Sequence, residues 1–99
     1  MIVKQIYDIL RKEELVSTME EYSVNWLKRH KSTASYLLHK KRDLSIGAKI
    51  NLLSEIKAKI TSTYSNHISL NFNPNLIHSL KTVESILISN IKETFNLQL

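Results

Sequence analysis

Apolar residues recur at intervals of three and four along most of the chain, a period typical of amphipathic helices. Five segments follow this period, and the stretches between them are short and polar. The segments span residues 2–16, 18–29, 32–42, 46–64 and 76–96. We therefore expect an all-α fold, a small bundle of about five helices that forms one domain over residues 1–99, with a long C-terminal helix.

Hydroxyl side chains mark the expected starts of three helices, because a serine or threonine oxygen can accept N–H groups that a helix start leaves unpaired. The candidate caps are Ser17 or Thr18 before the second helix, Ser32 or Thr33 before the third, and Ser45 before the fourth. Glu20 and Glu21 lie three residues after Ser17 and Thr18, so either pair can form a capping box.

Residues 65–75 are polar, rich in asparagine and contain the only proline, so we expect a connection there. Ile68, Leu70 and Phe72 alternate within it, which allows either a short extended segment on the core or an edge strand. Asn73 and Pro74 are typical of an N-cap and a first helical residue.

Two apolar stripes run along the expected C-terminal helix, more than one packing face needs. They can both be buried in a five-helix core, or the surplus face can pair with a second copy of the chain. We favour a homodimer. Its expected interface consists of Val83, Ile86, Leu87, Ile88, Ile91 and Phe95. On the fourth helix the expected core stripe is Ile46, Ile50, Leu53, Ile56 and Ile60, and Trp26 is expected in the core.

Composition excludes several kinds of chemistry. The chain has no cysteine, one glycine and one proline, which excludes disulfides, thiolate metal sites, a cysteine nucleophile and glycine-rich phosphate loops. The histidines show no ligand spacing, and the serines have no nucleophile elbow around them. We expect neither an enzyme nor a bound cofactor or metal. No secretory signal or membrane-spanning run is visible, so we expect a cytoplasmic protein.

Positive charge is concentrated in one short segment. The chain carries a formal net charge of +5, and residues 28–42 hold six basic residues and no acid, so the remainder of the chain is slightly negative. The basic residues are Lys28, Arg29, Lys31, Lys40, Lys41 and Arg42. A localised basic segment is typical of a surface that binds an anionic partner, most often nucleic acid.

The six charges flank the third expected helix at both ends, and a short turn at residues 30–33 joins that helix to the second one. Two short helices with such a turn can place the second of them in the DNA major groove. The six basic residues would bind phosphates, as would the side chains and backbone N–H groups of Ser32 and Thr33 at the helix start. Thr33, Ser35, Tyr36 and His39 would approach base edges.

The same region resembles the lambda-repressor-like helix-turn-helix superfamily, in particular a branch of short uncharacterised bacterial and phage proteins. The resemblance covers about residues 2–60. It is carried by Tyr22-Ser23-Val24-Asn25-Trp26-Leu27, Lys31-Ser32, Ser35-Tyr36-Leu37, Arg42-Asp43-Leu44-Ser45-Ile46 and Leu52-Leu53. It implies DNA binding by the helix at residues 32–42, and we expect double-stranded DNA as the partner. Within the single domain we expect a helix-turn-helix core over residues 2–64. The glycine usual in the turn is replaced by His30 or Lys31.

Alternatives remain at this stage. Tyr36 can pack inward or lie against DNA, and His39 can contact DNA or only solvent. The domain can also be a protein-interaction module, such as a phage-encoded inhibitor or adaptor whose basic patch binds an acidic protein surface. A third hypothesis is that the protein is a structural subunit of an assembly. Removal of the charges at Lys40, Lys41 and Arg42 separates DNA binding from protein binding.

Overall fold

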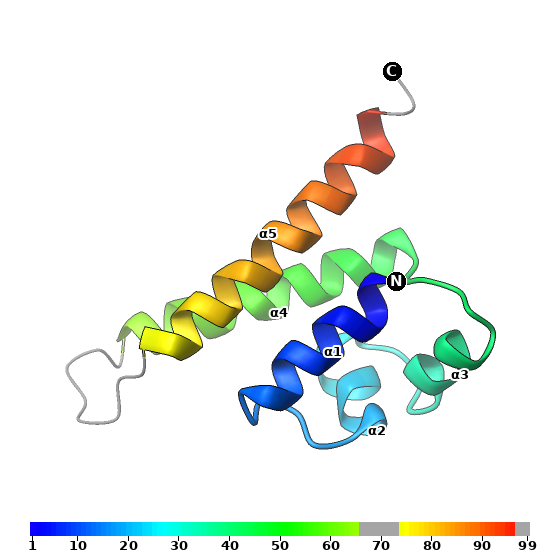
Figure 1. Cartoon of the computed structure of the whole chain (residues 1–99), viewed down its shortest axis with the longest axis horizontal. Helices are drawn as coiled ribbons and strands as arrows, with labels where there is room; N and C mark the ends of the chain where they lie inside the picture. Colours follow the sequence, from blue (N-terminus) through cyan, green and yellow to red (C-terminus); the bar gives the residue numbers. More distant parts are fainter. Residues whose placement is uncertain (66–73, 97–99) are drawn as a thin grey trace. The chain divides into compact units, whose positions relative to one another are not determined.

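The computed structural model describes residues 1–65 and 74–96, and all regular secondary structure in these residues is helical. The expected all-α class is therefore confirmed. The helices are α1 (Ile2–Lys12), α2 (Met19–Glu21) with the π-helical turn η1 (Tyr22–Trp26), α3 (Thr33–His39), α4 (Ile46–Ser65) and α5 (Pro74–Asn96) (Figure 1). The chain forms two compact units, Met1–Leu52 and Leu53–Leu99, which divide within α4. A single domain over residues 1–99 stays a prediction.

The first helix ends four residues earlier than its apolar period predicts. Glu14 has a left-handed backbone (φ 60°), its N–H donates to the Arg11 carbonyl (3.0 Å), and the Leu15 N–H donates to the Leu10 carbonyl (2.9 Å). These two bonds are the Schellman closure of a helix. Val16 is nevertheless buried. Val16 follows the apolar period of α1 although it lies after the helix, and for this reason the predicted helix was too long.

The start of α1 is capped by a residue from the far end of the first unit. The Asp43 carboxylate accepts the N–H groups of Ile2 (3.0 Å) and Val3 (3.0 Å), and also that of Leu44 (2.9 Å). Figure 1 shows the segment after α3 returning to the amino end of α1. Burial opposes ionisation of Asp43, but these three hydrogen bonds and the charge of Lys49 lower the pKa of its carboxyl group below the ordinary value.

The second helix begins at one of the two predicted caps. The Thr18 hydroxyl oxygen accepts the Glu21 N–H (3.1 Å), so Thr18 is the cap and Ser17 is not. After one α-helical turn the helix widens into η1, where the Leu27 N–H donates to the Tyr22 carbonyl (3.1 Å). It ends at Trp26, three residues before the expected end at residue 29. Trp26 is buried, as expected.

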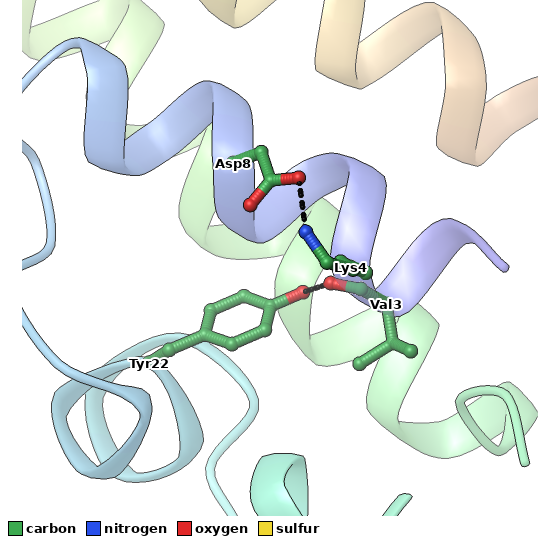
Figure 2. Close-up of polar contacts among 4 residues, drawn as sticks. All are labelled: Val3, Lys4, Asp8 and Tyr22. Carbon is green, nitrogen blue, oxygen red and sulfur yellow. Dashed lines mark hydrogen bonds and ion pairs between the residues drawn. The ribbon is translucent and has the colours of Figure 1, made fainter. Parts of the chain in front are cut away.

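Tyr22 fastens η1 to α1. Its side chain is fully buried, its ring lies 5.3 Å from that of Tyr7, and its hydroxyl donates to the Val3 carbonyl (3.0 Å) (Figure 2). Burial, with a smaller contribution from the charge of Asp43, raises the pKa of the Tyr22 hydroxyl far above its ordinary value. The hydroxyl therefore stays a donor. Figure 2 also shows the exposed Lys4–Asp8 pair (2.8 Å) on the outer side of α1.

The fourth helix begins at its predicted cap but buries a different face. The Ser45 hydroxyl oxygen accepts the Ala48 N–H (3.2 Å), as predicted. Ile46 and Ile50 of the expected core stripe are 39% and 51% exposed, whereas Ala48 and Leu52 are buried. The small Ala48 faces the core near the start of α4. The sequence pattern pointed to the larger isoleucines instead, because they dominate the apolar period. Of the remaining members of the expected stripe, Ile56 is buried, and Leu53 and Ile60 are half-buried.

In the second unit, the last part of α4 runs antiparallel to α5. Lys57 forms an ion pair with Glu84 (3.9 Å), and the Lys81 ammonium lies 5.4 Å from the centre of the Tyr64 ring. Pro74 is the first residue of α5, as expected. Most of the expected connection, with Asn73 and the alternating Ile68, Leu70 and Phe72, lies outside the described residues, and the helices at its two ends include Ser65, Pro74 and Asn75.

The buried stripe of α5 changes the expected dimer interface. The buried residues are Ile77, Leu80, Val83 and Leu87. Val83 and Leu87 are fully buried within one chain, so they cannot lie at a surface open to a second copy, and their assignment to the interface was wrong. Ile86, Ile88 and Ile91 are half-buried, and Phe95 is 51% exposed. No helix in the described part of the chain is both long and apolar enough to cross a membrane.

Candidate nucleic-acid interface

The connection between η1 and α3 is closed by a lysine in a left-handed conformation. Lys28 has φ 56°, and the following N–H, that of Arg29, donates to the Ser23 carbonyl (2.9 Å). Left-handed backbone favours glycine, because other side chains meet the backbone there. The resemblance placed the missing glycine at His30 or Lys31. In the structure, Lys28 is the residue of this connection with left-handed backbone.

A buried serine joins the two short helices of the site. Ser23 is fully buried; its hydroxyl donates to the Met19 carbonyl (2.9 Å) and accepts the Ala34 N–H (2.9 Å) at the start of α3. Ser23 is therefore the cap of α3, a role that we expected of Ser32 or Thr33. Sequence reasoning missed it because the cap comes from the preceding helix. The available signal was a serine inside the expected second helix, because such a side chain can bond the carbonyl four residues back.

The first N–H groups of α3 already have acceptors within the chain. The Ser32 N–H donates to His30 Nδ1 (3.2 Å), the Thr33 N–H to the His30 carbonyl (3.0 Å), and the Ala34 N–H to Ser23. The expectation that Ser32 and Thr33 bind phosphate through these N–H groups was therefore wrong. The Ser32 hydroxyl lies 2.9 Å from His30 Nδ1 and is exposed, while Thr33 is half-buried.

Two contacts hold the connection against the start of α4. The Asn51 side-chain amide donates to the Leu27 carbonyl (3.1 Å) at the end of the second helix. Arg29 Nη1 donates to the Lys28 carbonyl (3.2 Å), and its Nη2 lies where a Cβ on Gly47 would come within 2.8 Å. The Arg29 guanidinium thus lies close to the only glycine of the chain. Arg29 is exposed, but its guanidinium forms a hydrogen bond with the Lys28 carbonyl.

The outer face of α3 carries the polar residues that we expected near base edges. Ala34 is fully buried, and α3 contacts α1, α2 and η1, so its orientation is fixed by the core of the first unit. Ser35, Tyr36 and His39 are exposed, with Tyr36 at 50%. The alternative that Tyr36 packs inward was wrong. Leu37 and Leu38 are half-buried at the edges of the helix.

The third helix is shorter than the expected 32–42, and basic residues form its end. It stops at His39, and Lys41 has left-handed backbone (φ 54°). The Lys41 N–H donates to the Leu38 carbonyl (3.3 Å) and the Arg42 N–H to the Leu37 carbonyl (2.9 Å), a second Schellman closure. The exposed basic residues are Lys28, Arg29 and Lys31 before α3, and Lys40, Lys41 and Arg42 after it.

A comparison with protein families identifies the chain. The model of a family of unknown function, DUF6626, matches residues 3–96. The chain belongs to this family. No curated protein and no solved structure matches it. Within the described residues, no three histidine, aspartate or glutamate side chains form a group that could hold a metal ion.

Proposed function

We propose that this DUF6626 protein binds double-stranded DNA, with α3 in the major groove, as a small transcriptional regulator or a phage or mobile-element factor in the cytoplasm. One observation carries the proposal. The outer face of α3 presents Ser35, Tyr36 and His39, and exposed lysines and arginines lie before and after the helix with no acid between residues 28 and 42.

The dimensions of α3 support this proposal. Seven residues at 1.5 Å each give a helix about 10 Å long, and the major groove is about 12 Å wide. Basic residues at both helix ends are then within reach of the two phosphate strands that border the groove. Hydroxyl, phenol and imidazole groups between them can exchange hydrogen bonds with base edges.

The arrangement of the first unit also supports the lambda-repressor-like resemblance as part of the proposal. Two short helices, η1 with α2 and then α3, are joined by residues 27–32 and are followed by the longer α4. The buried Ser23 and the left-handed Lys28 fix how the second helix leaves the first. In a protein that binds the major groove, a fixed orientation of the second helix relative to the first lets phosphate contacts position the side chains that face the bases.

The salt dependence of duplex binding tests the proposal. If about six phosphates are contacted, log affinity falls with log salt at a slope of roughly −5. The variant Lys40→Ala/Lys41→Ala/Arg42→Ala should reduce that slope to roughly −2 to −3, because it removes three of the six charges. The measurement is fluorescence anisotropy with a random-sequence duplex over a range of salt concentrations.

A matched control removes three charges from exposed lysines elsewhere, as Lys12→Ala/Lys59→Ala/Lys92→Ala. It leaves the same net charge but should keep a slope near that of the wild type. Equal losses in the two triple variants, or a wild-type slope near zero, would contradict the proposal. Intact DNA behaviour, with loss of an acidic protein partner from the first variant only, would instead indicate a protein-interaction module.

We also propose that the chain forms a homodimer through the outer residues of α5, and that the two copies bind DNA together. The surface residues that remain from the expected interface are Ile86, Ile88, Ile91 and Phe95. A homodimer presents two copies of α3, and helix-turn-helix dimers of this kind read half-sites about one helical turn apart.

A further inference from the structure

One ridge of the last helix carries opposite charges on either side of an isoleucine. Glu84, Ile88 and Lys92 follow one another at intervals of four residues in α5. Side chains at this interval form a continuous ridge on a helix surface. Each is about 6 Å further along the axis than the one before it and about 40° further around it. The ridge therefore has an acid at one end, an apolar residue in the middle and a base at the other end.

This ridge is accessible in a single chain. Lys92 is exposed, Ile88 is half-buried, and the side chain of Glu84 is 27% exposed. One oxygen of Glu84 lies 3.9 Å from the Lys57 ammonium, which is itself largely exposed. A carboxylate has two oxygens that accept several hydrogen bonds, so Glu84 can bind a second cation as well.

An apolar ridge lies directly beside the charged one. Leu87, Ile91 and Phe95 also follow at intervals of four, and their exposure increases along the helix from fully buried through half-buried to 51%. The two ridges together form one strip of surface. Ile86 lies about 160° around the helix from Ile88, so one partner helix cannot cover both isoleucines.

Charge complementarity selects how a second copy of this strip can pack against the first. A two-fold axis at Ile88 makes the two helices antiparallel, and their ridges can then lie side by side. Each Glu84 lies beside Lys92 of the partner subunit in this arrangement. A parallel arrangement instead sets Glu84 against Glu84 of the partner subunit and does the same for the lysines, and such like-charge contacts are unfavourable.

We infer that α5 packs antiparallel against α5 of a second copy, with Ile88 at the two-fold axis and a Glu84–Lys92 ion pair between the subunits on each side of it. The inference rests on the proposed homodimer and deepens it, because it names the contact strip and its direction. Exposed ion pairs add little free energy. Ile88, Ile91 and Phe95 therefore supply most of the affinity, and the charges set the direction.

Disulfide trapping tests the contact strip, because the chain has no cysteine of its own. Oxidised Ile88→Cys should run as a covalent dimer on a gel without reductant, since equivalent residues at a two-fold axis come within disulfide reach. Phe95→Cys should not, because residue 95 lies about 10 Å along the helix from the axis, which separates the two copies by about 20 Å. Ile86→Cys, at a half-buried isoleucine outside the strip, is the control and should also stay uncrosslinked.

Charge reversal gives a second measurement that needs no cysteine. Glu84→Lys and Lys92→Glu should each weaken self-association by about fivefold in sedimentation equilibrium, because each sets like charges together on both sides of the axis. The double variant Glu84→Lys/Lys92→Glu should restore the wild-type dissociation constant. Glu93→Lys is the matched control, because it makes the same charge change at an exposed residue about 140° around the helix from Ile88 and should leave the constant unchanged.

The outcomes separate this inference from the proposals on which it rests. If Phe95→Cys or Ile86→Cys crosslinks as fully as Ile88→Cys, or if the double charge variant associates as weakly as the single ones, the antiparallel strip is wrong while the homodimer stands. A wild-type chain that stays monomeric at every concentration would overturn the homodimer and the inference together. Duplex binding, measured by anisotropy, tests the DNA proposal independently of both.

Discussion

At the residue scale, the buried Ser23 holds the start of α3, the helix proposed to read DNA. Its hydroxyl satisfies the Met19 carbonyl and the Ala34 N–H, and its own carbonyl accepts the Arg29 N–H. One buried residue thus joins the second helix, the connection and the start of α3. Without the Ser23 hydroxyl, the Ala34 N–H would lose its acceptor at a buried position, which costs free energy.

Replacement of Ser23 by alanine should lower the free energy of unfolding by about 1–3 kcal/mol, because it leaves the Ala34 N–H without an acceptor in a buried site. Urea unfolding followed by circular dichroism measures this loss. Ser35→Ala is the matched control, because it makes the same chemical change on the exposed face of α3 and should cost under about 0.5 kcal/mol. Equal costs for the two variants would show that Ser23 is not the cap.

At the scale of elements, the sequence predicts which helices exist better than where they end. The apolar period predicts all of the longer helices, because burial of one face enforces it. It misplaces the ends of α1 and α3, because Glu14 and Lys41 close those helices in a conformation that the sequence does not suggest without glycine. It misassigns the buried face of α4, because Ala48 is small and contributes little to an apolar pattern.

In the candidate site, too, some features could be predicted from local sequence and others could not. Exposure of the basic residues and of Ser35 and His39 could be predicted, since charge and polarity favour solvent. The caps at the starts of α1 and α3 could not, because Asp43 and Ser23 reach them from other parts of the chain. Contacts over such sequence separations depend on tertiary structure, which local patterns do not contain.

The cap that Asp43 gives to α1 should make stability depend on pH. Asp43→Asn should lower the free energy of unfolding by about 1 kcal/mol at pH 7, the usual cost of a lost cap. The hydrogen bonds lower the folded-state pKa of Asp43, so its contribution is present above the unfolded pKa of about 3.9 and is lost as pH falls through the folded value. The difference between wild type and variant should therefore vanish at low pH.

Urea unfolding between pH 2 and pH 7 checks this prediction. Asp8→Asn is the control, because it removes a carboxylate from an exposed pair with Lys4 that is worth only a few tenths of a kcal/mol. A difference between wild type and Asp43→Asn that persists unchanged to pH 2 would exclude the carboxylate as its source.

At the scale of the whole molecule, the chain consists of two units that carry different proposed tasks. Residues 1–52 hold α3 with its basic flanks, and residues 53–99 hold the outer residues of α5. Self-association can therefore be altered in the second unit without any change to the residues of α3, and it has its own measurement.

Phe95→Ser should weaken self-association at least about tenfold, because the ring is half exposed in one chain and its burial in a dimer is worth more than 1.4 kcal/mol. Sedimentation equilibrium measures the dissociation constant. Val24→Ser, at another exposed apolar residue in the first unit, should leave the constant unchanged. A wild-type chain that stays monomeric at every concentration would rule out the dimer.

The hydrogen bonds between Asp43 and the start of α1 also affect when α1 can be completed during synthesis. During synthesis α1 is made before α2, α3, α4 and α5, but the carboxylate that accepts the Ile2 N–H follows 41 residues later. At about 5–20 residues per second, the nascent helix waits several seconds for its cap. Helix α1 is thus one of the last parts of its unit to be completed, and a chain that ends before Asp43 lacks this cap.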